Sequence, residues 1–314
     1  MTLGKLIRHE TVLAALVVLA LFVLAAQSDK FFTLDNLLNQ GRLMTEVGLI
    51  AVIMTFVIIT GGIDLSVGSI LGMSAILLGV LWQNVGLPLE FAILLTLLVG
   101  AAGGLLNGLI ITRFGVPPLI ATLGTLALYR GIAEGVSEGR SVRGYPDWFY
   151  VLGQGQIGGV PTQLWLFLLV TVLAAIILGM TTWGRVTYAI GANETAARFS
   201  GLRVGWVKMA IYAASGGAAA LAAVIFVSRV STTRSDMGTG IELDAITAVV
   251  LGGTSIFGGR GTIIGTLLGL ILIQALKNGL SLAGVKSDGT IVLIGAVLIL
   301  TILVSNFVYR GGTR

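Results

Sequence analysis

The chain has 314 residues, of which 56% are hydrophobic and 11% are charged, and its formal net charge is +5. A water-soluble domain carries about 25% charged residues, and the mean hydropathy here is +1.00. This composition excludes a soluble globule and predicts an all-α polytopic membrane protein with one domain, residues 1–314. Cysteine is absent and His9 is the single histidine, which excludes disulfides, thiolate chemistry and a histidine-based metal centre.

The apolar runs set the number of expected membrane crossings. A bilayer core needs roughly 20 apolar residues per helix, and each crossing is expected to be helical because lipid offers no hydrogen-bond partners to the backbone. The first run, 12–26, follows Lys5 and Arg8 and fits a first transmembrane helix, with a cleaved signal peptide as the alternative. Nine further runs give about ten spans: 44–60, 67–82, 91–112, 118–133, 164–180, 207–228, 243–257, 262–282 and 290–308.

The basic residues lie mainly in loops beside these runs. We therefore interpret the net charge as a signal for orientation in membrane lipid and not for nucleic-acid binding. Ten spans threaded from a cytoplasmic N-terminus place more lysine and arginine in the cytoplasm, together with both termini. The two longest connectors, 134–161 and 181–206, are then external and cytoplasmic respectively.

The cytoplasmic connector contains a short, well-capped helix at residues 191–201. Asn193 is a good N-cap, Glu194 suits a helix N-terminus and pairs with Arg198 at i,i+4, and Gly201 supplies a stop. A helix of two turns is marginal in water, so it must be completed by packing, either on its own protein or against a cytoplasmic partner. We prefer the partner-docking interpretation, with the residues Gly191, Asn193, Glu194, Ala197, Arg198, Ser200 and Gly201.

Two glycine-broken stretches, 60–69 and 251–261, interrupt the apolar runs. Broken helices are tolerated where protein or water satisfies the backbone, and they often mark the moving part of a transporter. Close helix packing explains the same glycines, as it explains Gly104 with Gly108, and Asp64 could simply cap the helix that follows it near Leu65. The candidates for a pathway or gating role are Gly61, Gly62, Asp64, Ser66, Gly252, Gly253 and Thr254.

Other motifs are uninformative or absent. Gly153, Gly155 and Gly158 fit G-x-G-x-x-G but follow no expected strand, and no G-x-x-x-x-G-K-[ST] occurs. If transport is driven by ATP, the nucleotide site must therefore lie on another chain. An ion-driven transporter would need carboxylates or histidine in mid-membrane, whereas Glu46 and Asp64 are expected near span ends. We expect no catalytic residue and no metal site.

Several separated motifs carry a family resemblance: 60–69 (TGGIDLSVGS), 107–112, 117–125 (PPLIATLGT), 128–131 (LYRG), 191–201 (GANETAARFSG) and 249–266 (VVLGGTSIFGGRGTIIGT). With them the chain resembles the permeases of bacterial monosaccharide ABC importers of the ribose and xylose type, which include autoinducer-2 permeases. The motifs at 60–69 and 191–201 argue against a branched-chain amino-acid permease.

The resemblance implies the partners and the location. They are a cytoplasmic ABC ATPase that binds ATP and Mg²⁺, an external sugar-binding protein and a second identical or similar permease, in the bacterial inner membrane, with no cofactor on this chain. Residues 193–201 match the coupling helix of such importers. Residues 138–146 look like those of rhamnose-type permeases, so the expected substrate leans to rhamnose or another deoxyhexose or pentose, with ribose and autoinducer-2 open.

Overall fold

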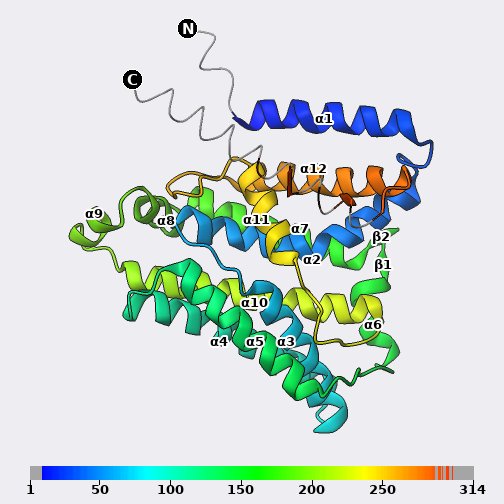
Figure 1. Ribbon diagram of the computed structural model, residues 1–314, viewed down its shortest axis with the longest axis horizontal. Helices are drawn as coiled ribbons and strands as arrows, with labels where there is room; N and C mark the ends of the chain where they lie inside the picture. Colours follow the sequence, from blue (N-terminus) through cyan, green and yellow to red (C-terminus); the bar gives the residue numbers. More distant parts are fainter. Residues whose placement is uncertain (1–8, 287–288, 291, 293–294, 297–298, 300–314) are drawn as a thin grey trace.

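The computed structural model describes residues 9–286, 289–290, 292, 295–296 and 299 (Figure 1). The predicted span 290–308 therefore lies almost entirely outside the described residues. The elements are α1 (His9–Gln27), α2 (Leu34–Ile59), α3 (Val67–Gly79), the π-helical turn η2 (Val80–Asn84), α4 (Leu89–Arg113), α5 (Pro118–Ser137), α6 (Asp147–Gln154), β1 (Gln156–Ile157), β2 (Val160–Pro161), α7 (Thr162–Met180), α8 (Thr182–Ala192), α9 (Glu194–Phe199), α10 (Val204–Val230), α11 (Ile241–Leu251) and α12 (Ile263–Leu282).

The predicted all-α membrane class is confirmed. Within the described residues seven helices are long and apolar enough to cross a membrane: α2, α3 with η2, α4, α5, α7, α10 and α12. Helix α1 adds a shorter apolar stretch, Leu13–Ala26. Several helices extend beyond the apolar runs because their ends are capped, as at α2, where the Thr33 side chain accepts a hydrogen bond from Asn36 N.

The predicted span 243–257 is wrong as a full helix. Helix α11 has 11 residues, which at 1.5 Å per residue reach about 16 Å, roughly half of a bilayer core. It ends at the Gly252–Gly253 pair, where Gly253 has φ 87°, a conformation that other residues rarely adopt. A loop rich in turns, residues 231–240, connects α10 to the start of α11 (Figure 1), so this crossing combines a loop and a half-helix.

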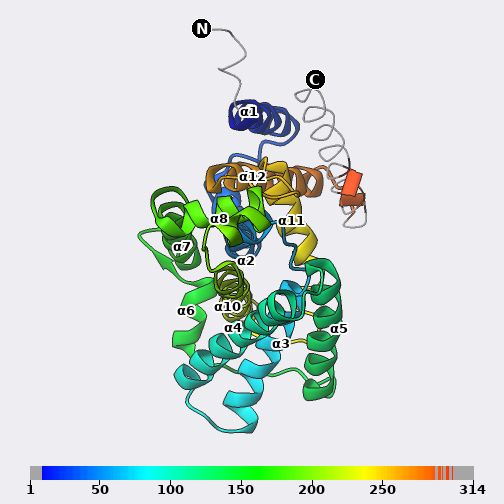
Figure 2. The same ribbon diagram turned by 90° about the vertical axis from the view of Figure 1, so that its left-hand side faces the viewer.

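The first glycine-broken stretch has the same design. Helix α2 ends at Ile59, and α3 begins at Val67, which is fully buried. Residues 62–65 read Gly-Ile-Asp-Leu and residues 240–243 read Gly-Ile-Glu-Leu, and α3 and α11 leave the middle of the bundle in opposite directions (Figures 1 and 2). We call residues 60–66, before α3, and residues 231–240, before α11, the two breaks; the helices that follow them share this short motif at their starts and run in opposite directions.

Helices α2 and α10 form the buried centre, while the sides of α4, α5 and α7 are largely exposed (Figure 2). Glycine permits the closest contact, between α4 and α10, because a Cβ at Gly104 would overlap the carbonyl oxygen of Tyr212. One turn further along α4, Gly108 lies against Met209 of α10. The predicted packing role of this glycine pair is confirmed.

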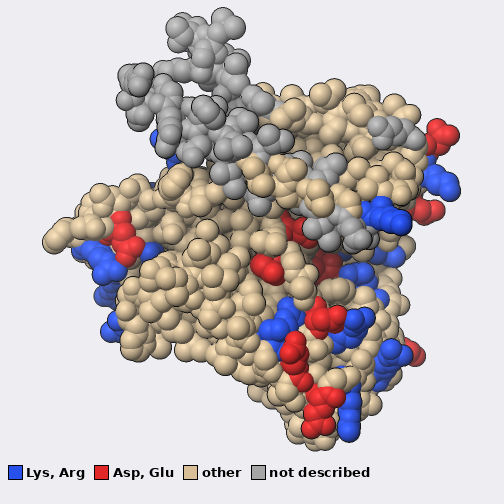
Figure 3. Space-filling model, viewed as in Figure 1, with Lys and Arg blue, Asp and Glu red and all other residues tan. Residues whose placement is uncertain are grey.

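The two long connectors lie at opposite ends of the bundle (Figure 1). One carries α8 and α9, and the other carries α6 and the β1–β2 hairpin, so each is more structured than a loop. Gly153 lies within α6 and Gly158 in the hairpin turn, so no strand leads into this G-x-G-x-x-G. Charged side chains gather at both ends, with a largely uncharged surface between them (Figure 3). We call them the α9 end and the α6 end.

Candidate functional site

The short helix α9 forms as its caps predict. The Asn193 side chain accepts a hydrogen bond from Ala196 N at 2.9 Å, and Arg198 Nη2 donates to Glu194 Oε1 at 2.6 Å. Ser200 Oγ donates to the Ala196 carbonyl oxygen at 2.9 Å, and Gly201 reverses the chain with φ 81°. The N-cap, the i,i+4 pair and the glycine stop that residues 193–201 predict are therefore all formed.

Lys208, a residue that the sequence interpretation missed, ties α9 to the bundle. It is buried in α10, and its Nζ donates to Glu194 Oε2. Burial alone would raise the pKa of the Glu194 carboxyl, but the hydrogen bonds from Lys208 and Arg198 outweigh it and lower that pKa. Because Lys208 lies outside the α9 sequence, no helical spacing pointed to this contact.

The two faces of α9 differ. Ala197 is buried with Ile190 and Val204 in a small apolar cluster, whereas Phe199 is 89% exposed. The helix therefore rests on its own protein through one face and presents an aromatic side chain on another.

Three predicted segments meet at one point, which we call the glycine junction: residues 59–61, 191 and 258–259. Gly259 N donates to the Ile59 carbonyl oxygen at 2.9 Å. A Cβ at Gly191 would overlap that same oxygen, and one at Gly258 would lie 3.0 Å from the Gly191 oxygen. The connector that carries α9 is therefore in backbone contact with the end of α2 and with the loop after α11.

The remaining predicted glycines serve two purposes: Gly61 and Gly253 have positive φ, and Gly62 and Gly252 allow close approach. Gly61 follows α2 at the junction, and Gly62 lies against the hydroxyl of Tyr212. Gly252 faces Gly265, where a Cβ would overlap the Gly265 carbonyl oxygen, and Gly253 ends α11. Thr254, directly after them, is buried, and its Oγ1 has no hydrogen-bond partner among the described residues.

Asp64 caps the turn at residues 65–66 that leads into α3, as the sequence suggests, although the helix itself is assigned from Val67. The fully buried carboxylate accepts hydrogen bonds from Ser66 N at 3.0 Å, Ser66 Oγ at 2.7 Å and Ser215 Oγ at 2.9 Å. Asn107 Nδ2 in turn donates to Ser66 Oγ at 2.7 Å. Asp64 therefore joins the first break to α4 and α10, and no ion pair involves it within the described part of the chain.

Arg130, in the 128–131 motif, connects the two breaks. From α5, its Nη1 donates to the carbonyl oxygens of Ser235 and Met237, and its Nη2 donates to that of Gly68 at 3.3 Å. These acceptors belong to the loop 231–240 and to the start of α3. An arginine within an apolar run is the sequence signal for such a role, although the sequence does not identify its partners.

Glu46 lies midway along α2, which begins at Leu34 with a polar first part. Its side chain is 3% exposed and accepts a hydrogen bond from Arg229 Nε of α10 at 2.7 Å. The carboxylate is therefore paired with a cation from the last turn of α10.

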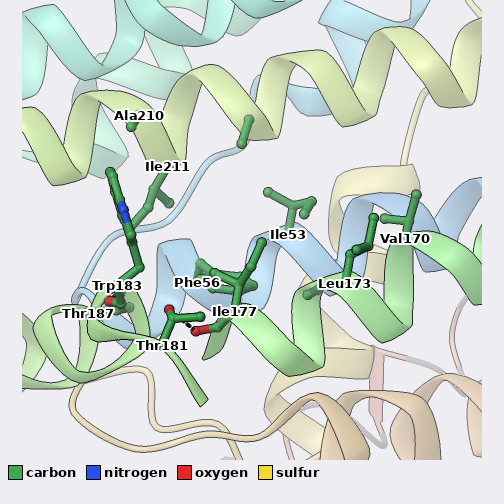
Figure 4. Close-up of a pocket in the computed structure, with 12 residues that line it drawn as sticks. Ile53, Phe56, Val170, Leu173, Ile177, Thr181, Trp183, Thr187, Ala210 and Ile211 are labelled. Atoms are coloured by element: carbon green, nitrogen blue, oxygen red, sulfur yellow. Dashed lines mark hydrogen bonds between the residues drawn. The ribbon is translucent and has the colours of Figure 1, made fainter. Parts of the chain in front are cut away.

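An apolar hollow of about 370 Å³ lies between α2, α7, α8 and α10 (Figure 4). Trp183 of α8 rises toward Ala210 and Ile211 of α10. The hydroxyls of Thr181 and Thr187 both donate to backbone carbonyls, those of Ile177 and Trp183. With both hydroxyls used in this way and an otherwise apolar lining, the hollow offers little to a hydrophilic ligand.

Sequence comparisons give the family. The family model described as "Branched-chain amino acid transport system / permease component" matches residues 36–302. The chain is 40% identical over 311 residues to the ribose import permease protein RbsC of Escherichia coli strain K12, which covers 97% of this chain and 95% of the relative. It is 43% identical over 273 residues to RbsC of Bacillus subtilis, covering 86% and 84%.

A third relative has a different named substrate. The chain is 37% identical over 309 residues to the autoinducer 2 import system permease protein LsrD of Photorhabdus laumondii, covering 96% of this chain and 92% of the relative. No solved structure matches the chain.

Proposed function

This chain belongs to the branched-chain amino acid transport system / permease component family, among its monosaccharide ABC importer permeases, and we propose that it forms the membrane path of an ATP-driven importer. The family description names amino acids, whereas RbsC and LsrD are named for ribose and autoinducer 2. These relatives, together with the motifs at 60–69 and 191–201, favour a small polyhydroxylated substrate.

Among such substrates, ribose and autoinducer 2 have the support of these relatives. The leaning to rhamnose rests on residues 138–146 alone and stays a prediction, because none of the three relatives carries that name. Uptake measured with each compound separately decides among them.

Energy enters at the α9 end, which we assign to the cytoplasm. The single observation that carries this proposal is that α9 is anchored by Lys208 while its connector touches the end of α2 and the loop after α11 at the glycine junction. A partner ATPase that binds ATP and Mg²⁺ would bind α9 and, by moving it, displace the glycine junction. Because the junction is backbone against backbone, the movement would reach residues 60–66 and 252–262 together.

In this account the permease performs no chemical step. An external binding protein would deliver the sugar at the α6 end, and a second permease subunit would complete the path. The ion-driven alternative needs a carboxylate available for an ion, but Glu46 is paired with Arg229 and Asp64 accepts three hydrogen bonds.

The test is reconstitution of the chain with its ATPase and binding protein in liposomes. We expect ATP-dependent uptake of ribose, rhamnose or autoinducer 2, and no uptake when ATP is replaced by a sodium or proton gradient. Uptake driven by either gradient in the absence of ATP would contradict the proposed function.

A further inference from the structure

A polar cavity of about 530 Å³ lies between the first half of α2, the end of α10, the segment 232–239 and the start of α11. Its volume is within the range of about 300–1,000 Å³ that small-molecule sites occupy. It lies toward the α6 end, because the last turn of α10 contacts α6 through the Ser228 Oγ bond to the Phe149 carbonyl oxygen, at 2.6 Å. A hollow lined by charged groups inside a membrane protein is a functional candidate.

The ionic groups of this cavity are balanced. Each of its three carboxylates is hydrogen-bonded to a cation; two of these cations, Arg229 and Arg234, line the cavity themselves, and Lys277, which is not part of the lining, balances the third carboxylate. The pairs are Glu46 with Arg229 at 2.7 Å, Asp236 with Arg234 at 2.6 Å, and Asp244 with Lys277 at 2.6 Å. A neutral ligand therefore fits the cavity better than an ionic one.

The ion pairs leave some donors of the guanidinium groups and some acceptor positions of the carboxylates unused. Arg229 uses only its Nε toward Glu46, while its guanidinium lies 4.8 Å from the ring centre of Phe226. A guanidinium has five N–H donors and a carboxylate about four acceptor positions, so both can also serve hydroxyl groups. Donors and acceptors alternating around an aromatic ring suit a molecule with several hydroxyls on a small carbon frame.

The floor of the cavity is Met237 and Gly238, which lie in the loop 231–240 before α11. Gly238 is in close backbone contact with Gly68, where a Cβ at Gly238 would lie 2.7 Å from the Gly68 oxygen. Arg130 holds the Met237 and Gly68 carbonyls from the other side. Movement of either break would therefore open or close the floor.

We propose that this cavity is a transit site that receives a neutral monosaccharide, or a polyol of similar size, from the external side before the floor opens. The site rests on the proposed importer function and gives it a substrate-handling location. Arg229 and Glu46 supply the central donor and acceptor. Specificity at this site is for a hydroxyl-rich, uncharged molecule.

Because the sequence contains no cysteine, single cysteines test the site directly. Thr239→Cys and Leu43→Cys place a thiol in the lining from two elements, the loop before α11 and α2, and Asn84→Cys, exposed on η2, is the matched control outside the cavity. Right-side-out vesicles with the complete importer are treated with a membrane-impermeant maleimide. Labelling is followed with ribose, rhamnose, autoinducer 2 or sucrose present at millimolar concentration.

We expect both cavity cysteines to be labelled and the compound that drives uptake to slow their labelling severalfold. Sucrose should not protect them, and Asn84→Cys should react equally under all conditions. Active uptake without protection at either cavity position, or cavity thiols that never react, would overturn the transit site and leave the importer function intact. Absence of uptake with all three compounds would instead refute the proposed function.

Discussion

At Asp64, a single side chain organises the entry to the first break. Its carboxylate accepts hydrogen bonds from Ser66 and Ser215, and Asn107 extends the network. These groups are buried, so each depends on Asp64, directly or through Ser66, for a partner that water cannot replace. The role is structural in this account and does not require the charge to move.

Two substitutions separate shape from charge at this position. Asp64→Ala leaves buried donors unpaired, at about 1–3 kcal/mol each, so we expect lower thermal stability and loss of uptake. Asp64→Asn keeps an acceptor for Ser66, and Ser215 can rotate to accept from the new amide. We expect it to retain stability and uptake. A stable Asp64→Asn protein without transport would show that the charge itself is needed.

Arg130 is the second residue that we expect to be critical. Arg130→Lys keeps the positive charge, but one ammonium cannot reproduce the forked contact with Ser235, Met237 and Gly68. We expect uptake to fall strongly while the ATPase still binds, because α9 is remote from this contact. The control is Arg140→Lys on the exposed surface. Normal uptake by Arg130→Lys would exclude a positioning role.

At the scale of elements, α9 is a helix too short to stand alone. Its Glu194 holds a lowered pKa in the folded protein, so the stabilisation from this group is complete above its ordinary value of 4.5 and is lost as the pH falls through the folded pKa. ATPase binding through α9 should therefore not change with small shifts of pH around neutrality, because Glu194 stays ionised there.

Replacing Glu194 by an uncharged residue tests how much its ion pair with Lys208 contributes to uptake. Glu194→Gln should weaken the link to Lys208 and reduce ATP-dependent uptake at neutral pH, where the carboxylate is ionised. Thr195→Ala, at an exposed position of the same helix, is the control for a general change in α9. Equal uptake by both variants would indicate that Lys208 does not position the helix.

Helix packing gives a prediction about stability. Gly104→Ala should destabilise the α4–α10 contact by about 1–3 kcal/mol, because the new methyl would overlap Tyr212. Gly124→Ala in α5 meets nothing within 4 Å and should be neutral or slightly stabilising. Thermal unfolding of both proteins in the same detergent compares them, and equal melting temperatures would contradict the close packing.

Hydropathy was sufficient to locate seven spans, because lipid requires long apolar helices. It failed at residues 243–257, where an apolar stretch of nearly spanning length forms a half-helix and a loop. The caps of α9 are local, so residues 193–201 revealed them. The contacts of Lys208, Arg130 and the glycine junction join distant segments, and a single sequence contains no periodic signal for such pairs.

At the scale of the whole molecule, the glycine junction is the link between α9 and the polar cavity. It lies near α9, while the polar cavity and its floor lie toward the α6 end, and residues 60–66 and α11 run between them (Figure 1). A displacement at α9 can therefore reach the cavity floor through two short, helix-broken segments. The long helices α2 and α10 provide the frame around them.

The central claim is that a partner ATPase drives this chain through α9. The most direct measurement is gentle extraction of the tagged chain, followed by mass spectrometry for a P-loop ATPase. Its control is a Glu194→Arg/Arg198→Glu variant. We predict that the ATPase copurifies with the unaltered chain and is lost from the variant. A stable, unaltered chain that captures no ATPase, even after crosslinking in intact cells, would contradict the account.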